Sequence, residues 1–386
     1  MWRGPLKPLN LTRSDRDMAE KTRALLAGET AAGDTVVGGA DTDTGNLASY
    51  DVDVELSLSK SVGKSGFGIP LILVGGQEKE IPYTECLDAD EVAAVFPAGT
   101  PVHDAAKLMY AQSTERFKIA VCGAKEKSAV KVFSLLGKDW RQLVVPTAGT
   151  EADSTIKEIS DAVEKTDRMY FATVKDLSEA PGKTVELEAG KTAPRDRTVC
   201  FKHGTNAYAA AALVGAIAQK DPGTYTCKNQ ILKELEPEAL DDTQIKTAHD
   251  AGCLCFVTKA GDNVTTEGKT LGGEYIDIID SKDYVIYRIQ YGSQKVFNQN
   301  DKVAYTDSGI TQLENVCVTV MKECYGDGNL IIDTDDSGKP AYSVNYGRRS
   351  ETSAADRQAR RYTLGRFSFS LLGAIHTAKV KGSIIV

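Results

Sequence analysis

The sequence predicts an α/β protein of mixed (α+β) character, with a two-domain body of mixed sheets and flanking helices and an extended β-strand arm at each end. Short apolar runs alternate with amphipathic stretches through the middle of the chain, an order typical of sheets covered by helices. On either side of this body, apolar and polar side chains alternate as in a half-buried strand. The 386 residues are enough for more than one hydrophobic core.

The elements of the body follow from the composition of short segments. Runs of β-branched and other apolar residues predict strands at Ile69–Val74, Phe117–Cys122, Arg141–Pro146, Met169–Val174, Thr198–Lys202 and Cys253–Val257. Apolar residues at helical spacing, or runs of alanine, predict helices at Ala89–Phe96, Val102–Ser113, Glu151–Lys165 and Ala207–Ala218. The last third is predicted to contain strands at Tyr275–Ile279, at Ala341–Tyr346 and from Tyr362 onward, and helices at Lys282–Gln299, Asp307–Tyr325 and Ala354–Arg361.

These elements divide the chain into five predicted parts. They are an N-terminal extension with a strand arm (1–60), the first part of the body (61–125), a middle α/β domain (126–222), a C-terminal core domain (223–373) and a C-terminal strand arm (374–386). Within the extension, residues 28–46 are rich in Gly, Thr, Asp and Ala and have too little apolar surface to fold alone. Translation starts either at Met1 or at Met18, and the sequence leaves both starts open.

The two arms carry opposite charges. In the N-terminal arm Asp53 and Glu55 alternate with apolar residues, namely Val52, Val54, Leu56 and Leu58. In the C-terminal arm Lys379 and Lys381 lie among the apolar residues Ala378, Val380, Ile384 and Val386. Opposite charges on paired strands contribute about 0.2–1 kcal/mol per pair. Two interpretations stay open: the arms pair with strands of neighbouring subunits, or each lies in a sheet of its own subunit.

Glycines mark the points where the arms join the body. Phe367 and Phe369 share one face of a predicted strand, and after Gly373 the apolar positions move to the opposite face. Gly63 and Gly66 separate the N-terminal arm from the body. Because glycine reaches backbone conformations that other residues disfavour, we expect hinges at these three glycines.

Composition restricts the partners and the compartment. The net charge of −8 argues against nucleic acid as a direct partner. No apolar run reaches the roughly 18–20 residues that span a bilayer, and the first residues lack the pattern of a secretion signal. The eight cysteines lie mostly in apolar stretches, as buried thiols do in a reducing compartment. We therefore expect synthesis in a cytoplasm and no membrane insertion.

The motifs that resemble chemical sites are incomplete. Gly268-Lys269-Thr270 lacks the earlier glycine of a phosphate-binding loop. The stretch 333–338 begins like a calcium loop, but Val344 stands where the bidentate glutamate belongs. Cys253 and Cys255 have no second ligand pair for zinc, and the four histidines are scattered. We therefore assign no catalytic, cofactor-binding or metal-binding residue. An α/β hydrolytic enzyme of unrecognised type remains a distant alternative.

An ordered series of short segments runs along the chain from residue 68 to residue 376. In chain order the segments are Gly68-Ile69-Pro70-Leu71-Ile72-Leu73, Tyr83-Thr84-Glu85, Asn206-Ala207-Tyr208, Asp221-Pro222-Gly223-Thr224-Tyr225-Thr226, Gly273-Glu274-Tyr275-Ile276-Asp277, Tyr305-Thr306-Asp307-Ser308-Gly309-Ile310, Ser353-Ala354-Ala355-Asp356-Arg357 and Leu372-Gly373-Ala374-Ile375-His376. No segment is specific alone, but in this order they resemble the tail sheath proteins of contractile-tailed phages and phage-derived bacteriocins. Residues 1–50 depart from the family by being longer than its usual start.

The resemblance implies a structural, non-enzymatic subunit. Sheath subunits form stacked rings of six around a tail tube protein, together with baseplate and tail terminator proteins, and contract to drive the tube through a host cell envelope. The resemblance further implies location in a virion tail that is assembled in the bacterial cytoplasm, and genome ejection. The alternative is the sheath of a bacteriocin or of a secretion-type injection system, which would assemble and contract in the same way.

A cluster of arginines near the C-terminus has two interpretations. The cluster comprises Arg348, Arg349, Arg357, Arg360, Arg361 and Arg366 in an otherwise acidic chain. One interpretation is a solvated charged face, which contributes little to stability. The other is that Arg357, Arg360 and Arg361 contact an acidic inner tube.

Overall fold

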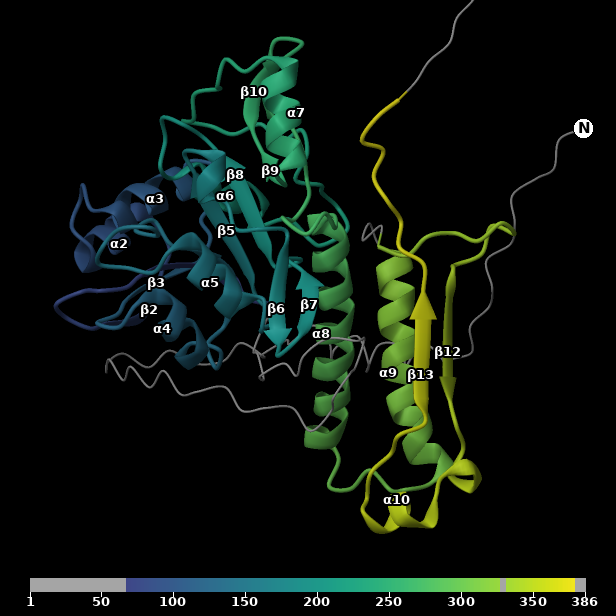
Figure 1. Ribbon diagram of the computed structural model, residues 1–386. Helices are drawn as coiled ribbons and strands as arrows, with labels where there is room; N and C mark the ends of the chain where they lie inside the picture. The colour runs from purple at the N-terminus through teal and green to yellow at the C-terminus, as the bar shows by residue number, and fades with distance from the viewer. Residues whose placement is uncertain (1–66, 327–330, 379–386) are drawn as a thin grey trace, which may run out of the picture.

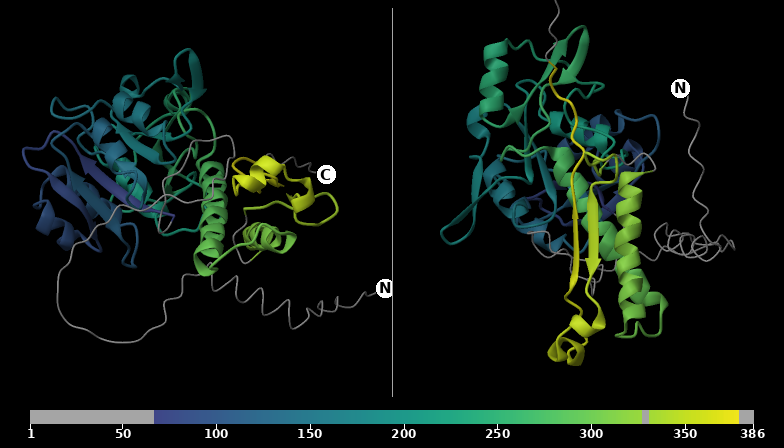
Figure 2. Two further views of the ribbon diagram at one scale, coloured as in Figure 1. Left: turned by 90° about the horizontal axis from the view of Figure 1, so that it is seen from below. Right: turned by 90° about the vertical axis from the view of Figure 1, so that its right-hand side faces the viewer.

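The computed structural model describes residues 67–326 and 331–378 (Figure 1). It has two parts: a large α/β body, and a C-terminal unit in which two long helices pack beside a β-hairpin. Figure 2 shows α8 lying between the body and the rest of this unit.

The body is built on one sheet of seven strands, in the order β2-β3-β1-β4-β5-β8-β9. β2 at one edge runs antiparallel to β3, and the other neighbouring pairs are parallel. The strands are β1 (Ile69–Val74), β2 (Ile81–Cys86), β3 (Ile119–Gly123), β4 (Trp140–Val144), β5 (Met169–Val174), β8 (Thr198–Lys202) and β9 (Cys253–Leu254). Because helices cover both faces, the central strands are apolar on consecutive residues, and Leu71, Ile72 and Leu73 are fully buried.

Three helices and one hydrophobic core lie on each face of this sheet. The first face carries α2 (Ala89–Val95), α3 (Pro101–Tyr110) and α6 (Ala209–Ile217). The second face carries α4 (Ser128–Ser134), α5 (Ile156–Val163) and α7 (Asp242–Asp250). α3 and α6 pack so closely that a Cβ on Gly215 would lie 2.2 Å from the Met109 carbonyl oxygen. Two hairpins complete the body: β6 (Thr184–Glu188) with β7 (Lys191–Pro194), and β10 (Phe256–Lys259) with β11 (Asp262–Thr265).

The C-terminal unit has its own core. It consists of α8 (Ile276–Gln299), α9 (Asp307–Tyr325), β12 (Tyr342–Tyr346), α10 (Ala354–Gln358) and β13 (Gly365–Phe369). The Thr306 hydroxyl caps α9 by accepting a hydrogen bond from the Gly309 amide at 3.3 Å. α8 is shared between two cores: Ile276 and Ile279 belong to the body, whereas Val285 and Ile289 pack with α9.

The predicted fold class is confirmed. Most predicted strands and helices of the body are present within a few residues, and so are the two long C-terminal helices and the final hairpin. The strand predicted at Tyr275–Ile279 is wrong, because these residues lead into and begin α8, which starts at Ile276 and not at Lys282. The predicted strand Cys253–Val257 is two strands, since the chain leaves the large sheet after Leu254 and pairs with β11 from Phe256.

The seven-stranded sheet takes strands from three of the five predicted parts of the chain, 61–125, 126–222 and 223–373. The division itself stays a prediction.

Candidate assembly site

The hairpin of β12 and β13 has two open edges. Tyr342 lies opposite Phe369 and Tyr346 opposite Gly365. One face of the hairpin packs on the α8–α9 core, whereas the other carries exposed Ser343, Asn345, Arg366 and Ser368. In the part of the chain that the structure describes, each of the two strands pairs only with the other. Their outer edges therefore present backbone groups to which another strand can bind.

Residues 373–378, a few positions after β13, lie on the surface without backbone pairing to the other described residues. The Leu372 amide donates to the Ile331 carbonyl at 2.8 Å, and beyond it no residue from Gly373 to Ala378 makes a backbone–backbone hydrogen bond to another described residue. His376 anchors the segment, since its Nε2 lies 2.9 Å from the Thr226 hydroxyl and its ring lies edge-on to Tyr275. Ile375 next to it is 89% exposed.

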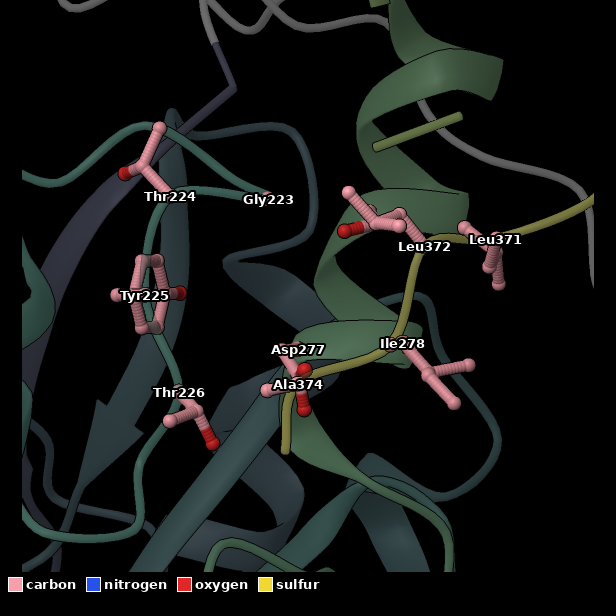
Figure 3. Close-up of a pocket in the computed structure, with 11 residues that line it drawn as sticks. Gly223, Thr224, Tyr225, Thr226, Asp277, Ile278, Leu371, Leu372 and Ala374 are labelled. Carbon is pink, nitrogen blue, oxygen red and sulfur yellow. The ribbon is translucent and has the colours of Figure 1, made fainter. Parts of the chain in front are cut away.

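A small pocket marks the place where this segment crosses from the C-terminal unit to the body (Figure 3). The pocket has a volume of about 220 Å³ and is lined by the loop 223–226, the start of α8 and the segment 371–374. Asp277 contributes a carboxylate to the lining, and burial raises its pKa. The departing chain thus contacts both α8 and the body.

At the N-terminal end of the described chain, a residue just before β1 also packs against α8. The Phe67 ring packs edge-on against Tyr284 with centroids 5.3 Å apart, and lies 5.9 Å from the ring of Tyr287. The guanidinium carbon of Arg141 lies 5.1 Å from the centroid of the same ring. Both ends of the described chain are therefore attached at the first half of α8.

A buried charge network fixes this half of α8 to the sheet. Arg141 of β4 is fully buried and contacts Asp280 at 2.6 Å and Asp283 at 2.7 Å. Arg197, next to β8, pairs with Asp283 through both terminal nitrogens, and the Tyr225 hydroxyl donates to Asp280 at 2.7 Å. Burial alone would lower the pKa of Arg141, but the carboxylates of Asp283 and Asp280 raise it above its usual range. Removing one member of such a network typically costs about 3–5 kcal/mol.

The structure places part of the arginine cluster at the far end of the C-terminal unit, near α10 (Figure 1). Arg357 donates to the carbonyl and hydroxyl of Thr352, and Arg361 pairs with Asp356 at 3.1 Å. Arg360 is exposed, with a left-handed φ of 55°, and has no ion-pair partner among the described residues. The three arginines thus share one turn, and their contact with a tube stays a prediction.

Most of the predicted arm residues lie outside the described residues. This holds for Val52, Asp53, Val54, Glu55, Leu56 and Leu58, for Gly63 and Gly66, and for Lys379, Val380, Lys381, Ile384 and Val386. Ala378 is described and exposed. Gly373 has no left-handed φ, and a Cβ there would meet nothing within 4 Å, so this conformation does not itself require glycine. The predicted hinge stays a prediction.

The motifs that resemble chemical sites in the sequence can be located within residues 67–326 and 331–378. No group of three or more His, Cys, Asp or Glu side chains in this range is arranged to hold a metal ion. All eight cysteines are buried, and burial raises the pKa of Cys86 and Cys122 to about 11. In the Asp-rich turn, Asp335 accepts hydrogen bonds from the Ser337 and Lys339 amides. Among the described helices, none is long and apolar enough to cross a membrane.

The fold is that of contractile sheath proteins. The chain is similar to a protein of the anti-feeding prophage helical sheath in its contracted state, with 11% identity, a TM-score of 0.61, and coverage of 89% of this chain and 99% of the other. It is also similar to a protein of the contracted PVC sheath complex of an extracellular contractile injection system, with 11% identity, a TM-score of 0.60, and coverage of 91% and 98%.

A third match is a chain of the six-fold symmetrised anti-feeding prophage baseplate, with 10% identity, a TM-score of 0.61, and coverage of 91% and 100%. No protein-family model matches the sequence, and no curated protein matches it. The resemblance expected from the sequence is thus confirmed at the level of the fold.

Sequence reasoning missed the residues that join the two parts of the molecule. The buried pairs of Asp280 and Asp283 with Arg141 and Arg197, and the anchor at His376, were not predicted. One signal was available: Ile276, Ile279, Asp280 and Asp283 lie at helical spacing, which puts two carboxylates beside apolar residues on one helix face. A charge in such a position needs a buried partner.

Proposed function

We propose that this chain is a structural subunit of a contractile sheath, which polymerises as stacked rings of six around a tube and contracts to drive that tube through a cell envelope. A tube protein, a baseplate and a terminator are its proposed partners, and a virion tail assembled in the bacterial cytoplasm is its proposed place. The likeness over 89% or more of the chain to proteins of contracted sheaths carries the proposal. It requires no catalytic residue, because the energy resides in subunit packing.

The open hairpin supports a specific mode of assembly. In this mode the arms at 51–58 and 375–386 of neighbouring subunits add strands to the outer edges of β12 and β13. Each added strand gains main-chain hydrogen bonds, and the alternation of side chains sets its register.

The arginines near α10 support a contact with the tube. They lie at the end of the C-terminal unit that points away from the body, in a chain of net charge −8. An acidic tube surface would attract this end through screened contacts that weaken as salt rises.

A second candidate differs in what is delivered. The matched chains belong to an anti-feeding prophage and an extracellular contractile injection system, which favours an injection device or bacteriocin over a tail that ejects a genome. Purified native particles separate the two: a DNA-filled head supports the phage tail, whereas headless particles support the injection device.

Electron microscopy of the purified full-length chain tests the proposal. A sheath subunit is expected to form long hollow tubes with a regular helical repeat, and those tubes should show six subunits per ring. Discrete globular particles at every concentration, with or without the tube protein, would contradict it and would restore the enzyme alternative.

A further inference from the structure

Asp153 lies where a sheet of this topology ordinarily binds a ligand. The parallel strands follow the order β3-β1-β4-β5-β8, in which the chain reverses direction across the sheet at β1. In open α/β sheets, ligands bind beyond the carboxyl ends of the strands at such a reversal, and phosphate groups commonly occupy the loop after the first strand. Here Gly75 and Gly76 follow β1, Ser128 follows β3 and Thr147 follows β4.

The Asp153 carboxylate accepts hydrogen bonds from all three loops. One oxygen accepts from the Gly75 amide at 2.9 Å, the Ser128 hydroxyl at 2.8 Å and the Thr147 hydroxyl at 2.7 Å. The other oxygen accepts from the amides of Ser128 at 2.8 Å and Ser154 at 2.7 Å. Asp153 is 2% exposed, so these five donors replace its water.

The neighbouring backbone is shaped around this carboxylate. A Cβ on Gly75 would lie 2.4 Å from an Asp153 oxygen, and Gly76 has a φ of +67° and would place a Cβ 1.9 Å from the Ala152 carbonyl oxygen. Only glycine fits both positions without a shift of the loop that carries Asp153. Burial alone would raise the pKa of Asp153, yet the hydrogen bonds from Thr147, Ser128, Gly75 and Ser154 hold it below its usual range.

We propose that residues 75, 128, 147 and 154 form a binding site for a small oxyanion, and that the chain fills this site permanently with its own Asp153 carboxylate. The body thus keeps the ligand crevice of a doubly wound sheet but closes it with an internal ligand. The three loops become rigid, and no external phosphate or carboxylate enters. The same donors should bind formate once the side chain is removed.

Chemical rescue tests this proposal on the full-length chain. Asp153→Ala vacates a space of the size of formate and leaves five buried donors without an acceptor, so its melting temperature should fall strongly. Sodium formate should then raise the melting temperature of this variant by about 2–4 °C at ten times its Kd, relative to sodium chloride of equal ionic strength.

Two controls separate rescue from general salt effects. Asp250→Ala removes an exposed carboxylate and should show no formate-specific shift. Asp153→Asn should be destabilised but not rescued, because the amide fills the space. If Asp153→Ala does not remain folded, refolding yield in formate against chloride gives the same readout. Wild-type stability of Asp153→Asn, or equal formate shifts in Asp153→Ala and Asp250→Ala, would overturn the proposal.

Discussion

β2, one of the two edge strands of the large sheet, and the hairpin of the C-terminal unit differ in how accessible their unpaired backbone is to another strand. β2 carries Pro82, which lacks an amide donor, and Glu85, which pairs with Lys118 at 2.8 Å. Both features discourage the addition of another strand. β12 has the sequence Tyr-Ser-Val-Asn-Tyr, with neither proline nor charge, and β13 has a single arginine. β2 is therefore protected against strand addition, whereas the hairpin of β12 and β13 remains open to it.

The same contrast holds for burial. The central strands of the body are covered on both faces, whereas the hairpin is covered on one. α8 joins the two regions through buried charges as well as through apolar contacts. Under the proposed mode of assembly, stability and assembly depend on separate regions, which can be altered separately.

The largest expected effect is on assembly. Deleting residues 374–386 should abolish tubes and leave a folded monomer, because its described residues, 374–378, are mostly exposed and are held to the body through His376. Sedimentation and circular dichroism measure the two outcomes. A Gly/Ser tail of equal length should behave like the deletion. If the shortened chain still forms normal tubes, the C-terminal arm has no role in assembly.

The next effect is on the buried charge network that fixes α8 to the large sheet. Asp280→Ala leaves the buried Arg141 with one fewer carboxylate and the Tyr225 hydroxyl without its acceptor. We expect a loss of about 3–5 kcal/mol in the free energy of unfolding. Arg116→Ala breaks the exposed pair with Asp88 and should cost at most about 1 kcal/mol. Denaturant titration measures the free energy of unfolding of both variants. An equal decrease in the two would contradict the stabilising role of the network.

A smaller effect is expected on the pH dependence of the stability of the body. Burial raises the pKa of Glu164 to about 7 from 4.5, although it accepts hydrogen bonds from the Thr198 hydroxyl and the Arg197 amide. The protonated form is thus favoured on folding. Its stabilising effect is complete below pH 4.5 and is lost as the pH rises through 7.

Glu164→Gln removes this titration. Relative to the wild type, the variant should gain up to about 3 kcal/mol at pH 8 and nothing at pH 4. Unfolding experiments across that range test the prediction. A constant difference between the two proteins at all pH values would show that Glu164 does not titrate as stated.

The smallest effect on stability is expected at the arginine turn. Reversing Arg357 and Arg360 to glutamate should change the unfolding free energy by about 1 kcal/mol or less, since both lie near the surface. Sheath–sheath tubes should persist, while co-sedimentation with the tube protein should fall and lose its salt dependence. Arg116→Glu on the body is the matched control. Unchanged tube binding would leave the arginines as a solvated face.

The sequence predicted elements best where burial alone determines them. Strands such as β1 and β5 are apolar on both faces, and α9 has an apolar stripe. The beginning of α8 was misassigned because Asp280 and Asp283 interrupt its apolar face, and their partners are distant in sequence. α4 was missed because it is short, and α7 and the hairpin β6–β7 were missed because they are short and mostly exposed. Asp153 gave no signal, since its donors come from three separate loops.

Electron cryomicroscopy of the assembly in its extended and contracted states is the most direct test. We predict that residues 69–372 superimpose between the two states, with differences concentrated at 59–68 and 372–374. The arms 51–58 and 375–386 should pair with strands of neighbouring subunits in both states. Arms that lie within their own subunit, or that separate and pair again on contraction, would contradict the account, as would a large rearrangement within the body.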